Sequence, residues 1–298
     1  CIPPFSFSES LQPKLRETTR RIALALGVRG LVNVQYAIKG ETVYVIEANP
    51  RASRTVPFIS KATGVPLAKC AARIMAGERI ADLHLPRDTR RLDWFCMKEA
   101  VMPWGRFPGA EVILGPEMKS TGEVMGIAKS YPEAYAKTQL AIDYKLPEPS
   151  SGKVFISVCD RDKRHILSVA RILRYLGFDI CSTEGTARVL RGGNVTCEVV
   201  EKISGPHDGE LPNIGDMIAR GEIALIINTP YGPGSRGDGY ILRTEAVRRG
   251  VTCVTAMSAA NTYVSAIEAV REDQAGHGSA NEMGMDVIAL QDLPQYDA

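Results

Sequence analysis

Apolar and polar residues alternate along two neighbouring stretches early in the chain. The stretch 32–39 is apolar at every second position, and the stretch 42–48 is rich in β-branched residues. Both patterns are typical of half-buried strands. Gly40 lies between them, so we predict a β-hairpin with its loop at 40–42. That loop places Gln35 directly opposite Glu47.

Polar side chains gather where the second strand ends. Glu47 and Asn49 share one face of this strand because side chains alternate with a period of two. With Gln35 they form a set of oxygen-bearing side chains, which suits a hard cation such as Mg²⁺. Arg51 and Arg54 follow at once, and the guanidinium fork suits phosphate or carboxylate groups. The alternative is an ordinary exposed strand end, because an isolated Glu-x-Asn-Pro-Arg is a weak signal.

The remaining first half reads as a mixture of helices, strands and turns. Periodic apolar positions predict helices, the apolar run at 94–101 predicts a strand, and Ser, Gly and Pro clusters predict turns. The predicted helices are 11–26, 67–75 and 131–141, and the predicted turns are 60–64, 115–116, 121–122 and 126. Residues 146–152 have linker composition. We therefore expect two domains, 1–146 and 147–298.

The second half alternates short apolar runs with amphipathic helices. This alternation is typical of an α/β domain built on an open, mostly parallel sheet. The predicted strands are 154–159, 179–182, 195–200, 224–228, 251–255 and 287–290, and the predicted helices are 162–176, 185–190, 214–220, 238–249 and 260–272. The segment 231–239 is rich in glycine and reads as a loop.

Candidate ligand groups in this half fall at the ends of successive strands. Ligands bind outside the carboxyl ends of such strands, where helix N-terminal N–H groups also suit a phosphate. The candidate residues are Lys163 after the first strand, Thr183, Gly185 and Thr186 after the second, Lys202 after the third, and Asn228 and Thr229 at the end of the fourth. Taken singly, each threonine could be no more than a helix cap.

Composition narrows the function classes. The formal net charge is +2, from 36 Lys and Arg against 34 Asp and Glu, which gives no electrostatic case for nucleic acid. No stretch approaches the ~20 apolar residues of a membrane span. Seven cysteines occur without a CxxC pair, which argues against a disulfide framework or a zinc site. We therefore expect a cytoplasmic protein.

These residues carry a resemblance to a known family. The segment from Gln35 to Gly77 resembles the end of an ATP-grasp domain, and its amino-acid sequence is similar to the second synthetase half of the carbamoyl-phosphate synthase large chain. The resemblance continues through 115–126 and on to the C-terminus. It implies a C-terminal fragment of a longer polypeptide, an ATP-dependent ligase that we expect to be inactive as this fragment alone.

The resemblance also implies roles for the residues above. Gln35, Glu47 and Asn49 would hold Mg²⁺ or Mn²⁺ against the ATP phosphates. Arg51 and Arg54 would contact the transferred phosphoryl group or the product. The parent enzyme would phosphorylate carbamate made from bicarbonate and ammonia, for pyrimidine and arginine synthesis. Its expected partner is a glutaminase small subunit, and we expect the full-length enzyme to be a homo-oligomer.

The second half resembles the methylglyoxal-synthase-like allosteric domain of the same large chain. There, residues matching Lys163, Thr183, Gly185, Thr186, Lys202, Asn228 and Thr229 bind the phosphate of a nucleotide effector, so a UMP- or UTP-type effector is implied. The run 253–255 lacks two of the three polar groups that enteric relatives use for ornithine, which puts ornithine activation in doubt. The alternatives are a stand-alone regulatory nucleotide-binding module and a different ATP-grasp ligase, such as acetyl-CoA carboxylase or biotin carboxylase.

Overall fold

The computed structural model describes residues 1–4, 10–86, 92–106, 117–142, 146–205, 210–229, 233–276, 285 and 287–293, and within these it describes only the backbone of 233–236 and 273–276. The chain divides into two compact units. Unit 1 comprises Cys1–Lys98, Ile127–Tyr131 and Asp286–Ala298, and unit 2 comprises Glu99–Gly126 and Pro132–Met285. Among the described residues, no helix has the length and apolarity that crossing a lipid bilayer requires.

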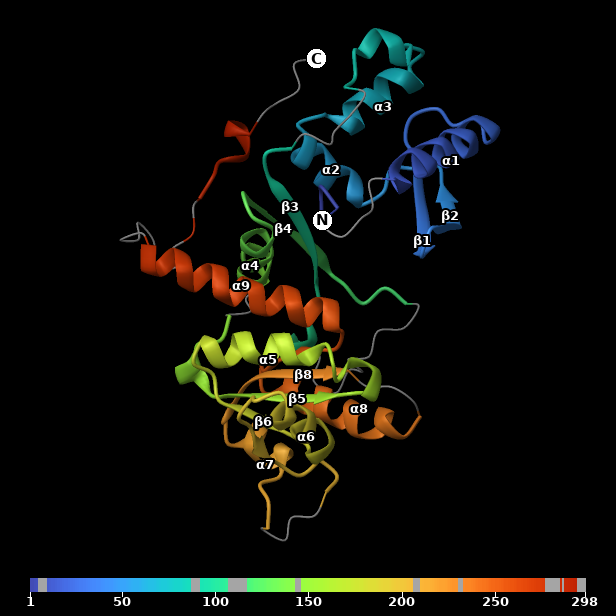
Figure 1. The fold of residues 1–298 in the computed structure, drawn as a ribbon. Coiled ribbons are helices and arrows are strands. Elements are labelled where there is room, and N and C mark those ends of the chain that lie inside the picture. Colours follow the sequence, from blue (N-terminus) through green and yellow to red (C-terminus); the bar gives the residue numbers. More distant parts are fainter. Residues whose placement is uncertain are drawn as a thin grey trace. The chain divides into compact units, whose positions relative to one another are not determined.

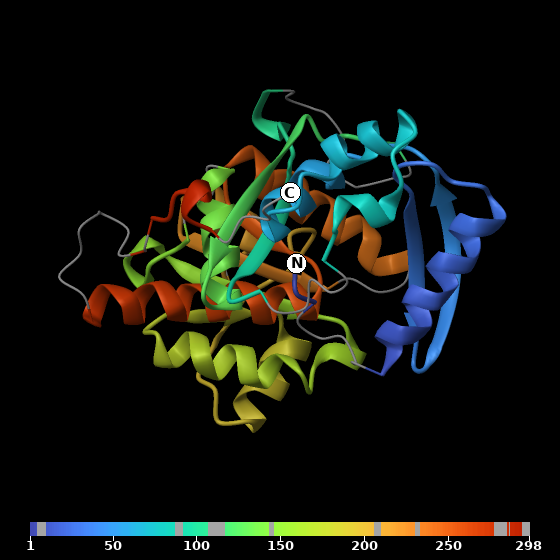
Figure 2. The same ribbon diagram turned by 90° about the horizontal axis from the view of Figure 1, so that it is seen from above.

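Unit 1 contains the predicted hairpin and three helices. The helices are α1 (Leu11–Ala25), α2 (Thr55–Thr63) and α3 (Leu67–Met75), and the antiparallel strands are β1 (Asn33–Lys39) and β2 (Thr42–Asn49). Helix α1 lies beside the hairpin in both ribbon views (Figures 1 and 2). The Thr19 and Tyr36 hydroxyls lie 2.6 Å apart and join the helix to β1.

Helix α2 corrects the prediction of a turn at 60–64. The helix continues to Thr63, and only Gly64, with φ of 71°, adopts the left-handed conformation that ends it. Phe58 and Ala62 are both buried. They stand four residues apart, so they share the buried face of the helix and their packing outweighs the turn-like composition.

A second correction to the predicted first half of the chain concerns β4 (Gly122–Ala128), which pairs with β3 (Phe95–Val101). The glycines at 122 and 126 suggested turns, yet both lie in the strand. A Cβ on Gly126 would stand 2.1 Å from the backbone oxygen of Ala134, in α4 (Tyr131–Ala141). Gly126 therefore serves close packing of strand and helix. The predicted turn at 115–116 lies outside the described residues.

Unit 2 is built on a parallel five-stranded sheet, which confirms the predicted α/β class. The strand order is β7-β6-β5-β8-β9, with every neighbouring pair parallel. The strands are β5 (Lys153–Val158), β6 (Ile180–Ser182), β7 (Glu198–Val199), β8 (Ile223–Thr229) and β9 (Thr252–Val254). The helices are α5 (Ile166–Tyr175), α6 (Glu184–Gly192), α7 (Ile214–Ala219), α8 (Pro233–Arg248) and α9 (Met257–Gly276).

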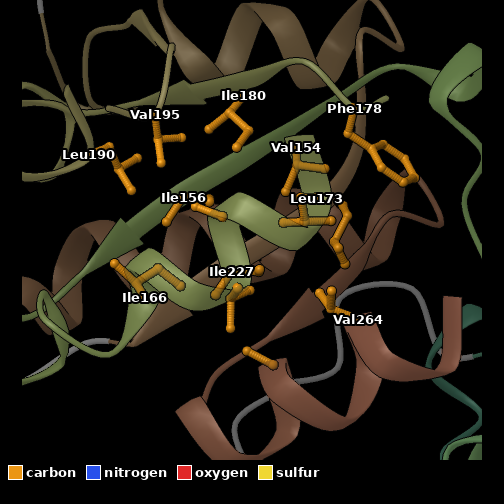
Figure 3. Packing of buried hydrophobic residues seen from close by; sticks show 14 of the residues in the cluster. Val154, Ile156, Ile166, Leu173, Phe178, Ile180, Leu190, Val195, Ile227 and Val264 are labelled. Atoms are coloured by element: carbon orange, nitrogen blue, oxygen red, sulfur yellow. The ribbon is translucent and has the colours of Figure 1, made fainter. Parts of the chain in front are cut away.

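Alternate residues of the central strand β5 feed two separate cores. Val154 and Ile156 pack with α5, α6 and α9, whereas Phe155 packs with α7 and α8. Figure 1 shows α5 and α9 on one side of the sheet and α7 on the other, and Figure 3 shows the first core from close by. A strand buried on both faces reads as a continuous apolar run, which is why the sequence revealed it.

Two segments in the second half of the chain have a structure other than the predicted one. Helix α8 begins at Pro233, so the predicted loop at 231–239 is wrong from that residue onward, and proline is well suited to the first turn of a helix. The predicted strand at 287–290 is also wrong. Residues 287–289 have no regular structure, and Val287 is 88% exposed, so its side chain lacks the burial that would stabilise a strand.

Candidate functional site

The hairpin brings Gln35 and Glu47 together as predicted, by a different route. Lys39 pairs with Thr42, so the turn holds two residues rather than three. A register shift next to Gln35 then adds one residue, Ile46, to β2. This bulge restores the pairing of Gln35 with Glu47 that the shorter turn alone would have lost.

Asn49 joins this pair at the end of β2. Its Nδ2 donates a hydrogen bond of 2.8 Å to Glu47 Oε1, and in the ladder Asn49 faces Asn33. Glu47 and Gln35 are exposed. Within the described part of the chain, no three His, Cys, Asp or Glu side chains gather as a metal site. Amide and carboxylate oxygens do fit a hard cation that is shared with substrate phosphates.

Arg51 and Arg54 lie just beyond this strand end, and both are exposed. The Arg51 backbone N–H donates to Asn49 O at 2.9 Å, which holds the residue close to the polar cluster. Arg54 occupies the N-cap position of α2 without a side-chain capping bond. Their guanidinium groups are accessible to an anion.

Unit 2 contains a cavity of about 910 Å³ at the carboxyl ends of β5, β6 and β8. Each of the seven strand-end residues predicted from the sequence lines it: Lys163, Thr183, Gly185, Thr186, Lys202, Asn228 and Thr229. The structure therefore gathers residues that lie up to 66 positions apart in the chain, from Lys163 to Thr229, around one space. Its volume is in the range typical of small-molecule sites.

Lys163 supplies positive charge to the cavity but is paired in this structure. Its Nζ lies 2.5 Å from Asp160 Oδ1, and the Lys163 side chain is 24% exposed while that of Asp160 is 93% exposed. The hydrogen bond from Lys163, with its positive charge, holds the pKa of Asp160 below its usual range. Arg161 and Lys202 also line the cavity.

The two threonines are more than helix caps. Thr183 stands at the N-cap of α6, yet its side chain makes no capping bond and its Oγ1 lies 3.3 Å from Ser157 Oγ. Thr186 is 2% exposed, and its hydroxyl accepts a hydrogen bond of 3.3 Å from the Val158 N–H. The capping interpretation fails for both hydroxyls.

Asn228 and Thr229 end strand β8. The Asn228 Nδ2 donates to Ser157 O at 3.0 Å, while its buried Oδ1 has no hydrogen-bond partner. Thr229 Oγ1 accepts a 3.3 Å hydrogen bond from the Cys159 N–H. A buried acceptor without a partner is costly, so an orphaned oxygen in a cavity-lining residue is typical of a ligand site.

Sequence reasoning missed the acidic groups of this cavity. Asp160 lines it, and Asp162, just behind, receives a hydrogen bond of 3.1 Å from Cys159 Sγ. Burial alone would raise the pKa of Asp162, but hydrogen bonds from Cys159 and Thr229 and the charges of Arg161 and His165 leave that pKa below its usual range. Asp160 and Asp162 lie between strand β5 and Lys163 in the sequence, and this position could have indicated that they belong to the cavity.

Two family models match the chain in succession. Residues 3–83 match the ATP-binding domain of the carbamoyl-phosphate synthase L chain, and residues 165–255 match the MGS-like domain. The second match covers most of the sheet and six of the seven cavity residues named above, all but Lys163. The chain thus joins part of an ATP-binding synthetase domain to an α/β domain of the MGS-like class.

Relatives of known identity agree with this class. The chain is 49% identical over 91% of its length to a carbamoyl phosphate synthase large chain from Methanothermobacter thermautotrophicus, covering 25% of that protein. It is 45% identical over 91% of its length to the "Carbamoyl phosphate synthase large chain, C-terminal section" of Aquifex aeolicus, covering 52% of it. The chain belongs to the carbamoyl phosphate synthase large chain family, and it spans about a quarter of the full-length relatives.

A solved methylglyoxal synthase from Elizabethkingia anophelis is a remote neighbour. It shares 14% identity over 40% of this chain and 80% of its own, with a TM-score of 0.32. This similarity is too low to carry an argument.

Proposed function

We propose that the cavity of unit 2 binds the phosphate group of a nucleotide effector. The observation that carries this proposal is the convergence of the seven strand-end residues on one cavity. Lysine ammonium groups, hydroxyls and the N-terminal N–H groups of α6 together supply what a phosphate requires. The apolar side of the lining, from Val199, Ile203, Leu211 and Leu242, offers a surface for the nucleoside.

Isothermal titration of the 298-residue chain with UMP tests this function. UMP binding is expected, whereas uridine, which lacks the phosphate, binds much more weakly. Lys163→Met should weaken UMP binding about tenfold, since hydrogen bonds to charged groups contribute about 1.5–3 kcal/mol. Lys153→Met is the matched control, because Lys153 bonds Glu198 and does not line the cavity.

If the chain binds UMP, two results would still contradict the proposal. One is equal affinity for UMP and uridine, which would remove the phosphate from the binding mode. The other is an equal loss of affinity in the two lysine variants, which would reduce the effect to general charge or stability. Absence of binding at millimolar UMP would overturn the proposal outright.

We further propose that unit 1 supplies metal and phosphate ligands to an ATP-dependent synthetase that phosphorylates carbamate. The pairing of Gln35 with Glu47, and the contact of Asn49 with Glu47, support it. Mg²⁺ bound there would neutralise the charge that develops on the ATP phosphates. Glu47 and the two amides would hold the ion, and Arg51 and Arg54 would hold the phosphoryl group.

The whole synthetase would draw on bicarbonate and on ammonia from a glutaminase small subunit in the cytoplasm, serving pyrimidine and arginine synthesis. We place the domain boundary of this chain between residues 146 and 147. In the whole synthetase, Glu47→Gln should abolish ATP-dependent carbamoyl phosphate formation. Glu41→Gln, in the exposed hairpin turn, is the control. Equal activity in both variants would exclude Glu47 from the metal site.

A further inference from the structure

Lys202 lies in a short segment that the sheet itself does not hold. Strand β7 ends at Val199, and beyond it the Glu201 N–H donates to Pro212 O at 2.8 Å and Glu201 O accepts from the Ile214 N–H at 3.1 Å. A turn follows, in which the Gly205 N–H donates to Lys202 O at 2.8 Å. Lys202 therefore reaches the cavity from a loop whose shape has to be set by other groups.

One buried side chain sets that shape. Asn213 is 3% exposed, and its Nδ2 donates to Lys202 O at 2.8 Å and, more distantly, to Gly205 O at 3.4 Å. Its Oδ1 accepts from the Gly215 N–H at 2.8 Å and caps α7. The opposite orientation of the amide would place its oxygen against two carbonyl oxygens, so the hydrogen bonds fix the orientation.

Packing holds this arrangement from both sides. A Cβ on Gly215 would stand 3.0 Å from Ile203 Cγ1 and 3.1 Å from Asn213 Oδ1, so the helix start lies close against the loop. On the other side of the loop, Ser204 Oγ donates to Asp238 Oδ1 in α8. The backbone of Lys202 is thus tethered, whereas its side chain is exposed.

We propose that Asn213 is the positioning residue that sets the site of Lys202 at the phosphate cavity. The inference rests on the proposed nucleotide-binding function and assigns a determinant of phosphate recognition within it. A lysine ammonium is a point charge on a flexible stem, so its reach depends on where its backbone is held. A carboxamide can both donate to the loop and accept from the helix. A carboxylate cannot donate, and a hydroxyl is too short to span both partners.

Titration of the 298-residue chain with UMP tests this assignment in a double-mutant cycle. Asn213→Ser keeps a good N-cap residue and removes the amide donors without adding charge. Asn213→Ser and Lys202→Met should each weaken UMP binding about tenfold, because each removes one charge-assisted contact to the phosphate. The double variant should bind no more weakly than Lys202→Met alone. Uridine binding should not change in any of them.

Ile218→Val is the matched structural control. Ile218 is buried in α7, so this change destabilises the same helix modestly without touching the loop carbonyls. It should lower the melting temperature and leave UMP affinity unchanged. If Asn213→Ser does not fold, Asn213→Asp keeps the cap and loses the donors, and it should show the same loss of affinity.

The outcomes separate this inference from the function on which it rests. A wild-type chain that fails to bind UMP overturns both. Wild-type binding with unchanged affinity in the Asn213 variants overturns the positioning role alone. Additive losses in the double variant, or a loss of affinity in Ile218→Val equal to that in Asn213→Ser, also overturn it, because Asn213 would then act independently of Lys202 or only through stability.

Discussion

Gly185 offers a test in which stability and phosphate affinity move in opposite directions. It is the second residue of α6, and a Cβ built on it would have one neighbour within 4 Å, Lys163 Nζ at 3.5 Å. This is an ordinary van der Waals distance, so Gly185→Ala creates no clash. Its backbone lies outside the left-handed region, so alanine is also unstrained there.

The stability effect follows from helix propensity. Alanine is favoured over glycine by about 0.5–1 kcal/mol within a helix, and a position in the first turn belongs near the lower end. Gly185→Ala should therefore stabilise the chain by about 0.5 kcal/mol. Gly192→Ala is the matched control, because Gly192 ends the same helix, has open space around its Cβ position and does not line the cavity.

The affinity effect follows from the position of the new methyl group. It would occupy the space between the Lys163 ammonium and the N-terminal N–H groups of α6, which is where we place the phosphate. Losing one charge-assisted contact of about 1.5–3 kcal/mol reduces affinity by at least about tenfold. Gly192→Ala should gain similar stability and bind UMP as the wild type does.

Urea unfolding and calorimetric titration with UMP measure the two effects separately. Unchanged UMP affinity in Gly185→Ala would show that the phosphate does not approach this helix start. Reduced stability in Gly185→Ala, with none in Gly192→Ala, would contradict the contact distances themselves. The first result would refute the proposed place of the phosphate, and the second would refute the argument from helix propensity.

Three further changes test other parts of the structure. Asp160→Asn should tighten UMP binding about two- to threefold in calorimetric titration, because it frees the Lys163 ammonium from an ion pair that is weak since its carboxylate is almost fully exposed. Weaker binding would instead make Asp160 part of the ligand site. Gly126→Ala should destabilise the chain by about 3 kcal/mol or more in urea unfolding, since the new Cβ would stand 2.1 Å from the Ala134 carbonyl oxygen. A loss of unfolding free energy below about 1 kcal/mol would contradict the packing of β4 on α4. Burial raises the pKa of the Cys181 thiol from 9.0 to about 12. The folded state therefore favours the neutral thiol, and this contribution to stability is complete below pH 9 and should be lost as pH rises from 9 towards 12. Cys181→Ala should flatten the fall of the unfolding free energy over that pH range. An identical pH profile in the variant would refute the pKa shift.

The cavity of unit 2 could be predicted from the sequence because parallel strands end at one edge. Once β5, β6 and β8 were recognised as buried apolar runs, the residues after them had to converge. Lys163, Thr186 and Asn228 therefore needed no knowledge of side-chain packing. The pairing of Gln35 with Glu47 was predicted from a three-residue turn, which is wrong. The pairing still occurs because the bulge at Ile46, which left no signal in the alternation, compensates for the shorter turn.

The errors occur where long-range packing decides. Gly126 looks like a turn residue until the Ala134 carbonyl oxygen is seen to need its missing side chain. Residues 60–63 look like a loop until Phe58 and Ala62 are seen to share a buried helix face. Asn213 was not predicted from the sequence, because only the bridge between Glu201 and Asn213 and the hydrogen bond to Lys202 O show that it holds the Lys202 loop.

The charges that line the cavity determine what kind of ligand it can bind. In the free chain the Lys163 ammonium is already compensated by Asp160, so an incoming phosphate replaces one anionic partner with another. The net gain is smaller than for an unpaired lysine, because the existing ion pair has to be broken. In the proposed complex, Thr183, Lys202 and the start of α6 would give the phosphate contacts beyond the one that Asp160 makes with Lys163. This exchange of anionic partners would suit reversible binding, in which occupancy follows the concentration of the proposed nucleotide, better than permanent retention of a cofactor.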